Sequence, residues 1–172
     1  MRKIVYQLLI ASVASAIFAL ALATSSRARE IVAFDAPFDP GTIVIRTQQR
    51  QLFLVIGEGY AIRYPVGVGR AGQQWTGVAY IDGKYVEPDW APPPVMRRNP
   101  AAPVQVIAGG SPKNPMGIAA LTLTGGEYAI HGTNQPDSIG RFVSSGCIRM
   151  QNADVVDLYQ RVAVGTPVVV TH

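Results

Sequence analysis

The sequence has 172 residues, of which 48% are hydrophobic, and a formal net charge of +4 at pH 7. This length is enough for one domain that buries roughly two thirds of its unfolded surface, and no second domain is required. Because Lys and Arg do not cluster as a nucleic-acid-binding surface requires, we expect no nucleic-acid partner. The mild positive charge instead suits an anionic polymer.

The first 23 residues have the layout of a secretory signal peptide, with a basic start at residues 1–3 and an apolar run that ends in small residues. Cleavage after Ala23 or after Ala28 fits the small-residue pattern. An uncleaved anchor is the alternative, since about 20 apolar residues can span a bilayer. In either case we expect the rest of the chain outside the cytoplasm. After cleavage at Ala23 its charge is +2 (4 minus 2).

Residues 24–40 lack hydrophobic periodicity and are predicted to be a linker that enters a domain spanning residues 41–172. In this domain, short β-branched runs separated by turn residues predict strands. Glycines at 57 and 59 predict a tight hairpin between two of them, and an antiparallel sheet follows. The predicted strands are residues 42–45, 51–56, 61–66, 77–81, 118–123, 128–131 and 167–171.

The segment from 86 to 115 is rich in proline and is predicted to be a long ordered loop, a feature that usually has a function in a compact domain. A single helix is predicted from about Asn152 to Tyr159. Asn152 is a favourable N-cap, and acidic residues follow in the first turn, where the helix dipole favours them. The fold class is therefore mainly β, a sandwich or barrel with one short α-helix.

Cys147 is the only cysteine, so no disulfide can form within the chain. Such a thiol is either a small buried hydrophobic residue or a reactive group. Cys147, His131 and His172 are the only Cys and His side chains, whereas a structural zinc site takes four ligands. We therefore expect no metal. His172 is predicted to be frayed at the end of the sequence, which leaves His131 as the candidate base.

Strand alternation over residues 128–131 places Tyr128 and Ile130 on one face and His131 on the opposite face. Gly132 follows and is expected to let another group approach the imidazole closely. The thiol of Cys147 comes sixteen positions later (147 minus 131), after a turn of small residues and just before the predicted helix. A nearby imidazole or helix N-terminus lowers a thiol pKa, so we expect a reactive thiolate.

Residues 130–134 (IHGTN) and 143–150 (VSSGCIRM) closely resemble the YkuD-type L,D-transpeptidase catalytic domain family. The ordered match runs from His131 to Tyr159, and the strand and proline pattern from residue 41 onward is also similar. One position departs from the family pattern, because many members carry a second histidine where this chain has Ser145. The departure leaves His131 to handle the proton alone.

The resemblance implies a cysteine enzyme of peptidoglycan that needs no cofactor. Cys147 would attack the carbonyl that joins meso-diaminopimelate to D-Ala in a stem tetrapeptide, and D-Ala would leave. His131 would accept and return the proton. Attack on the resulting thioester by the amine of a neighbouring stem gives a 3-3 cross-link. Backbone N–H groups around Ser145, Gly146 and Cys147 would form the oxyanion hole.

The same resemblance assigns Gly132, Ser144 and Arg149 to the site. Arg149 is read as an anchor for a stem-peptide carboxylate through its bidentate geometry, with a structural ion pair to Asp154 as the alternative. Ser144 either binds substrate or holds the turn. Thr133 and Asn134 are interpreted as turn residues. Three aromatic residues are placed outside the site as satellite core; they are Trp75, Tyr80 and Trp90.

Several alternatives remain open. The same residues suit a cysteine L,D-carboxypeptidase or endopeptidase that uses water in place of the amine. A wall-binding module with an incidental cysteine and a redox-sensing thiol are the rivals from other classes. The acceptor is a second stem, a D-amino acid, a lipoprotein lysine or water. The expected location is the periplasm, in association with the cell wall, and the expected process is cell-wall biogenesis.

Overall fold

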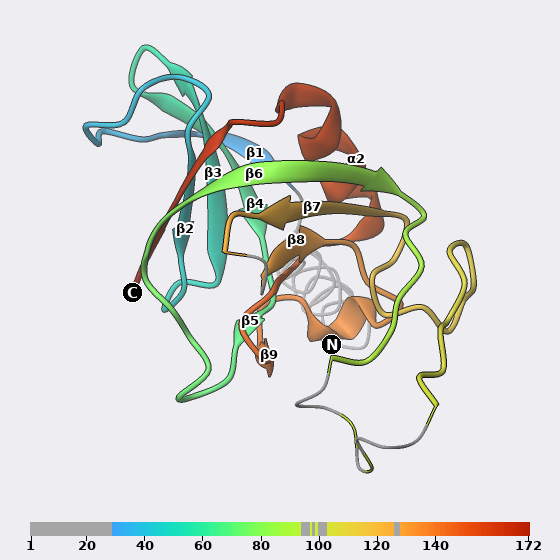
Figure 1. Ribbon diagram of the computed structural model, residues 1–172. Helices are drawn as coiled ribbons and strands as arrows, with labels where there is room; N and C mark the ends of the chain where they lie inside the picture. The colour runs from blue at the N-terminus through green and yellow to red at the C-terminus, as the bar shows by residue number, and fades with distance from the viewer. Residues whose placement is uncertain (1–28, 94–96, 98, 100–102, 126–127) are drawn as a thin grey trace, which may run out of the picture.

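The computed structural model describes residues 29–93, 97, 99, 103–125 and 128–172 (Figure 1). The predicted signal peptide and both of its cleavage positions lie outside the described residues, so they remain predictions. In the described ranges, no helix has the length and apolar character needed to cross a membrane.

The strands form two sheets. Their bounds are β1 (Glu30–Ala33), β2 (Ile43–Arg46), β3 (Gln51–Gly57), β4 (Tyr60–Pro65), β5 (Val68–Gly69), β6 (Gly77–Val86), β7 (Ala119–Leu123), β8 (Ala129–His131), β9 (Phe142–Ser144), β10 (Ile148–Arg149) and β11 (Pro167–Thr171). The larger sheet has nine strands in the order β1-β4-β3-β2-β11-β6-β7-β8-β10, and β5 pairs with β9 in a sheet of two. In Figure 1, β6 crosses in front of the steeper β2, β3 and β4, β7 and β8 lie below β6, and α2 (Asn152–Arg161) is at the upper right.

All seven predicted strands are present, and the hairpin joins β3 to β4 as expected. β6 is longer than its predicted run and extends to Val86. The sheet is not wholly antiparallel, because β2–β11 and β8–β10 are parallel pairs. Within the described residues, α2 is the only α-helix, and a short 3-10 turn, η2, covers Pro136–Ser138. The mainly β fold with one helix after the cysteine is therefore confirmed.

Part of the predicted linker, residues 24–40, forms a strand. Residues Glu30–Ala33 form β1, which pairs antiparallel with β4 at the edge of the sheet. Phe34, directly after β1, is buried and packs on Phe53 with ring centroids 4.8 Å apart. The segment is too short to show periodicity by itself, and its partner strand supplies the ordering contacts.

Strand alternation explains why both faces of β3 are buried. Leu52 and Leu54 point into the main core, which lies between the two halves of the sheet and α2. Phe53 and Val55 point the other way, into a second core that the segment around Phe34 covers. Burial of both faces removes apolar area from water, which is the main stabilising contribution to the fold.

Contacts from the sheet hold α2 at both ends. Asn152 is the first helical residue and not the N-cap, because Gln151 occupies that position without a side-chain hydrogen bond. The Asn152 side chain accepts a hydrogen bond from the Thr133 backbone N–H at 3.0 Å instead. At the other end, Lys84 Nζ on β6 donates to the carbonyl oxygens of Tyr159 and Val162 at 2.7 and 2.6 Å. The helix is thereby fixed beside β7 and β8.

The predicted long loop follows β6. Among its described residues only Trp90 and Ile107 form a backbone bridge. Asn114 is buried and donates from its side chain to the carbonyl oxygens of Pro88 and Ala108 at 2.8 and 3.2 Å. These bonds tie the two ends of the loop together without a strand, so the described part is ordered as predicted.

Candidate active site

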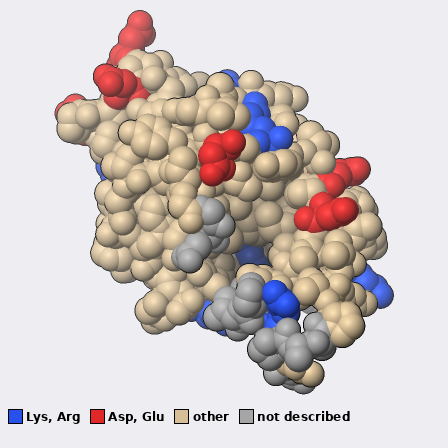
Figure 2. Space-filling model, in the orientation of Figure 1, with Lys and Arg blue, Asp and Glu red and all other residues tan. Residues whose placement is uncertain are grey.

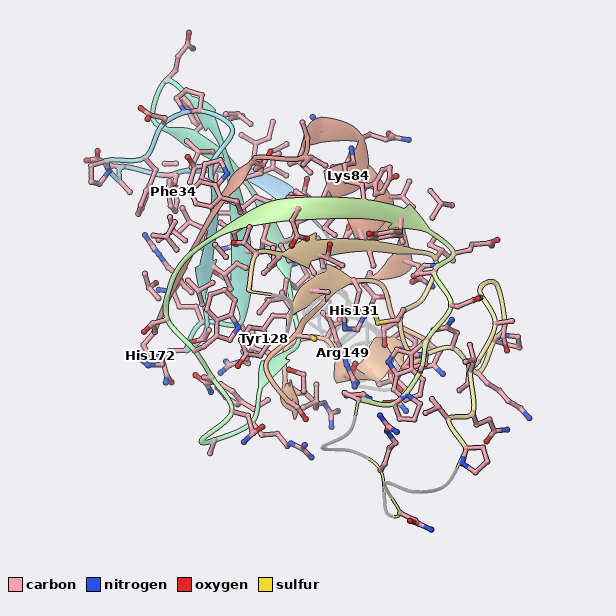
Figure 3. The ribbon with its side chains drawn as sticks, viewed as in Figure 1. Phe34, Lys84, Tyr128, His131, Arg149 and His172 are labelled. Carbon is pink, nitrogen blue, oxygen red and sulfur yellow. The ribbon has the colours of Figure 1, made fainter. Side chains whose placement is uncertain are left out.

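Parallel pairing of β8 with β10 brings the two sequence motifs together. Ile148 lies opposite Ile130, and Arg149 lies opposite His131. The two isoleucines are fully buried in the main core, so His131 and Arg149 lie on the other face of the pair. Figure 3 shows these two side chains in the same region of the molecule. Cys147 directly precedes β10, and its thiol is within reach of the Ala129 backbone N–H and of the charge of Arg149.

His131 is held in one orientation by its own neighbour. Its side chain is 4% exposed, and Nδ1 lies 2.6 Å from the carbonyl oxygen of Gly132. A carbonyl oxygen can only accept, so Nδ1 carries the hydrogen and Nε2 presents a lone pair. This carbonyl performs the orienting role for which the sequence offers no carboxylate.

The imidazole is neutral at neutral pH. Burial lowers the pKa of His131 to about 4, the Gly132 carbonyl opposes this shift, and the positive charge of Arg149 adds to it. Nε2 of this neutral imidazole can accept a proton, although the lowered pKa makes the ring a weak base.

The thiol of Cys147 is not the predicted thiolate. It is half-buried, and burial raises its pKa, while the backbone N–H of Ala129 and the charge of Arg149 oppose that rise. Two expected influences are weak here, because α2 begins only at Asn152 and the imidazole is uncharged. In the part of the chain that the structure describes, no hydrogen bond joins the thiol to His131. Both the Cys147 thiol and the His131 imidazole are therefore neutral at rest.

Ser144 holds the turn. Its hydroxyl donates to the Cys147 carbonyl oxygen at 2.6 Å and accepts from the Gly146 backbone N–H at 3.1 Å. The second bond corrects the expected oxyanion hole, because the Gly146 N–H is already engaged. Among the described residues, the N–H groups of Ser145 and Cys147 have no acceptor, and they remain the candidate donors.

An added Cβ would meet a neighbouring side chain at two glycines near the site. Gly146 has φ +126°, and an added Cβ would collide with the ring of Tyr128. At Gly132 a Cβ would collide with Oδ1 of Asn152. The close approach at Gly132 therefore comes from the start of α2, whereas we expected a group that approaches the imidazole.

Two guanidinium groups flank the turn formed by residues 144–147, here called the cysteine turn. Arg70 donates from Nη2 to Ser145 Oγ at 3.2 Å. Arg149 donates to Gln135 Oε1 at 3.4 Å, and burial together with the charge of Arg70 lowers the pKa of Arg149. Within the described ranges, neither arginine has a carboxylate within ion-pair distance. The hollow in Figure 2 has basic atoms at its floor, which favours an anionic ligand.

The alternative pair between Arg149 and Asp154 is wrong. Asp154 instead pairs with Arg29, whose Nη1 lies 3.7 Å from Oδ1. His172 is also remote from the site in Figure 3. Its Nδ1 lies 3.2 Å from Thr47 Oγ1, so the described end of the chain is bonded to the sheet and not simply frayed.

Trp75 contacts the cysteine turn directly, although we predicted that it lies outside the site. Its Nε1 donates to the Gly146 carbonyl oxygen at 3.1 Å. Its ring stacks on Tyr128 with centroids 5.0 Å apart and planes 5° apart. Tyr80 is half exposed on β6 and does remain outside. No local sequence signal marks Trp75, because its partner lies 71 positions away.

The sequence of this chain is similar to a known protein family and to several known proteins. The family model described as "YkuD: L,D-transpeptidase catalytic domain" matches residues 40–170. The protein named "Probable L,D-transpeptidase YbiS" of Escherichia coli K12 is 35% identical over 135 residues, which cover 74% of this chain and 43% of that protein. This chain therefore spans less than half the length of that relative.

Solved structures show the same fold at low sequence identity. L,D-transpeptidase 3 from Mycobacterium tuberculosis superposes with a TM-score of 0.62 at 17% identity, covering 76% of this chain and 60% of that one. The catalytic domain of the E. faecium L,D-transpeptidase gives 0.58 at 17% identity, covering 79% of this chain and all of that one. The sheet and helix arrangement is thus shared over most of the described residues.

Proposed function

This chain belongs to the YkuD family of L,D-transpeptidase catalytic domains, and we propose that it transfers acyl groups between peptidoglycan stem peptides through a thioester on Cys147. The observation that carries the proposal is the β8–β10 pairing, which sets Arg149 opposite His131, two positions after Cys147. A thiol, an imidazole and a guanidinium are the groups from which a cysteine acyltransferase can be built.

In the first half-reaction, His131 Nε2 accepts the proton of the Cys147 thiol as sulfur attacks the carbonyl between meso-diaminopimelate and D-Ala. The negative charge on the carbonyl oxygen is stabilised by the N–H groups of Ser145 and Cys147. When the intermediate collapses, the proton passes from His131 to the departing amine. The products are D-Ala and a thioester.

In the second half-reaction, an amine of a neighbouring stem attacks the thioester carbonyl. His131 takes a proton from this amine and returns it to sulfur, so the free thiol is restored and a 3-3 cross-link forms. No residue in either step has to change charge permanently. The neutral resting state of His131 and Cys147 is therefore the starting state of each cycle.

Arg149 supports the recognition of an anionic substrate. Its guanidinium lies close enough to lower the pKa of both the thiol and the imidazole, and the described residues supply it with no carboxylate. The terminal carboxylate of a stem tetrapeptide is a ligand of the right chemistry for it. The positive charge of Arg149 would also stabilise the Cys147 thiolate. It would destabilise a protonated His131 in the absence of substrate.

Export to the periplasm and association with the cell wall belong to the same proposal. Support comes from the basic, apolar and small-residue order of residues 1–23, and from a lone thiol that is compatible with an oxidising compartment. A lipoprotein lysine is a further candidate acceptor, since it presents the same kind of amine as a stem peptide.

The proposed function is tested by intact-mass spectrometry. The purified full chain is incubated with disaccharide-tetrapeptide, alone and with an acceptor stem, and compared with Cys147→Ala. We expect a thioester adduct, release of D-Ala and a 3-3 dimer in the wild type alone. A tripeptide product without dimer would instead identify a carboxypeptidase, and wall binding without turnover in both proteins would identify a binding module.

A further inference from the structure

Trp75 and Tyr128, here called the aromatic clamp, contact the cysteine turn at one residue, Gly146. The indole N–H binds the Gly146 carbonyl oxygen at 3.1 Å, and the two rings are stacked with nearly parallel planes. Trp75 comes from the connection between β5 and β6, and Tyr128 directly precedes β8. The clamp therefore links three separate segments at the turn that carries the thiol.

The bond from Trp75 fixes more than one carbonyl group. The peptide unit between Gly146 and Cys147 is planar and trans, so its C=O and N–H point in opposite directions. When the indole holds the C=O, the Cys147 N–H is directed away from Trp75. That N–H has no acceptor among the described residues, and it is one of the two candidate oxyanion donors.

Tyr128 limits the same turn from the side. Its ring lies so close to the Gly146 Cα that no side chain fits between them, and Gly146 has φ +126°. The ring also supports the indole by stacking. Tyr128 is three positions before His131. The clamp therefore connects the orientation of the cysteine turn to β8, the strand that carries His131.

We propose that Trp75 and Tyr128 are positioning residues that aim the Cys147 N–H at the carbonyl oxygen of the bound acyl donor. The proposal rests on the proposed function only in taking Cys147 as the nucleophile. The clamp acts on the donor of the oxyanion hole and leaves the proton transfer between Cys147 and His131 unchanged.

The test separates attack on a carbonyl from simple reaction of the thiol. Trp75→Phe keeps a ring to stack on Tyr128 and removes the N–H. Tyr128→Leu removes the stacking ring and keeps that donor. Tyr80→Phe is the control, since it removes an aromatic hydrogen-bond donor from the exposed face of β6. For each protein we measure acylation by p-nitrophenyl acetate, release of D-Ala from a tetrapeptide, alkylation by iodoacetamide and the thermal midpoint.

Alkylation is a displacement at carbon that forms no oxyanion, so a lost N–H alignment does not slow it. We expect Trp75→Phe to slow acylation about tenfold, less than complete removal of a donor costs, with alkylation within about twofold of wild type. Tyr128→Leu should show the same selective loss, and the control should show none. Unchanged acylation, or equal losses in acylation and alkylation, would overturn the proposal.

Failure of the proposed function would look different from failure of the clamp. If the wild type releases no D-Ala while Trp75→Phe still slows acylation by the aryl ester selectively, the stem-peptide assignment is wrong and the clamp stands. If the wild type releases D-Ala and Trp75→Phe does so at the same rate, the clamp is wrong and the function stands.

Discussion

Acidification should destabilise this fold through His131. The unfolded chain binds a proton at this residue below its ordinary pKa of 6.5, whereas burial delays protonation in the folded chain to about pH 4. The unfolded state therefore gains protons first as the pH falls from 6.5 to 4, and the folded state loses relative stability in that window. Above pH 6.5 both states are neutral at this position and the effect is absent.

The size of the effect follows from the difference between the two pKa values. A difference of 2.5 (6.5 minus 4) corresponds to about 3 kcal/mol of unfolding free energy, almost all of it lost at pH 4. Small domains have a total stability of roughly 5–15 kcal/mol, so the loss is large enough to measure.

Urea unfolding at pH 7 and pH 4 measures this loss in the wild type and in His131→Gln. Glutamine keeps an amide donor for the Gly132 carbonyl and has no charge to gain. All other titrating groups are common to both proteins, so the difference between their two losses isolates His131. We expect the wild type to lose about 3 kcal/mol more than the variant. Equal losses would refute the assignment of a buried neutral imidazole.

Three further predictions concern the thiol and the packing of α2. Alkylation of Cys147 should increase only toward alkaline pH, and Arg149→Gln should move the curve to higher pH, since Arg149 opposes the raised thiol pKa; a plateau that persists at acidic pH would contradict this. Lys84→Met should lower the unfolding free energy by about 2 kcal/mol in urea because two helix carbonyls lose a charged donor, whereas exposed Lys113→Met should change it by less than about 0.5 kcal/mol. Tyr64→Phe should cost about 1.5–3 kcal/mol in the same assay, because the buried hydroxyl donates to a carboxylate of α2 at 2.7 Å, and an unchanged midpoint would count against that bond.

Period-two patterns were enough to predict most of the sheet. In β3, for example, β-branched and aromatic residues between turn signals predicted the strand, and the observed bounds are Gln51–Gly57. β1 was missed because four residues at a sheet edge depend on β4 for their order. The parallel pairs were missed for a similar reason, since local patterns do not specify which strand becomes a neighbour.

The two motifs are neighbours in the fold, since Arg149 pairs with His131, but the sequence did not predict the chemical state of the side chains. Cys147 lies where a helix N-terminus and an imidazole were expected to lower its pKa, yet burial has the larger effect. The turn that carries Cys147 is contacted by Trp75, which is distant in the sequence. The sequence also did not predict that the Gly146 N–H, expected as an oxyanion donor, donates to the Ser144 hydroxyl in the structure. The balance between desolvation and hydrogen bonding appears only once the chain is folded.

The position of β11 has a consequence for how the protein is made. β11 lies between β2 and β6 and joins the hairpins of the first half of the sheet to the strands that carry the site. Its pairing with β2 connects residues more than 120 positions apart, for example Val168 with Ile43 (168 minus 43). Contacts of such long range form late and slowly. During synthesis Cys147 therefore precedes the strand that joins the two halves of the sheet, and the chain carries its thiol before the sheet can be completed.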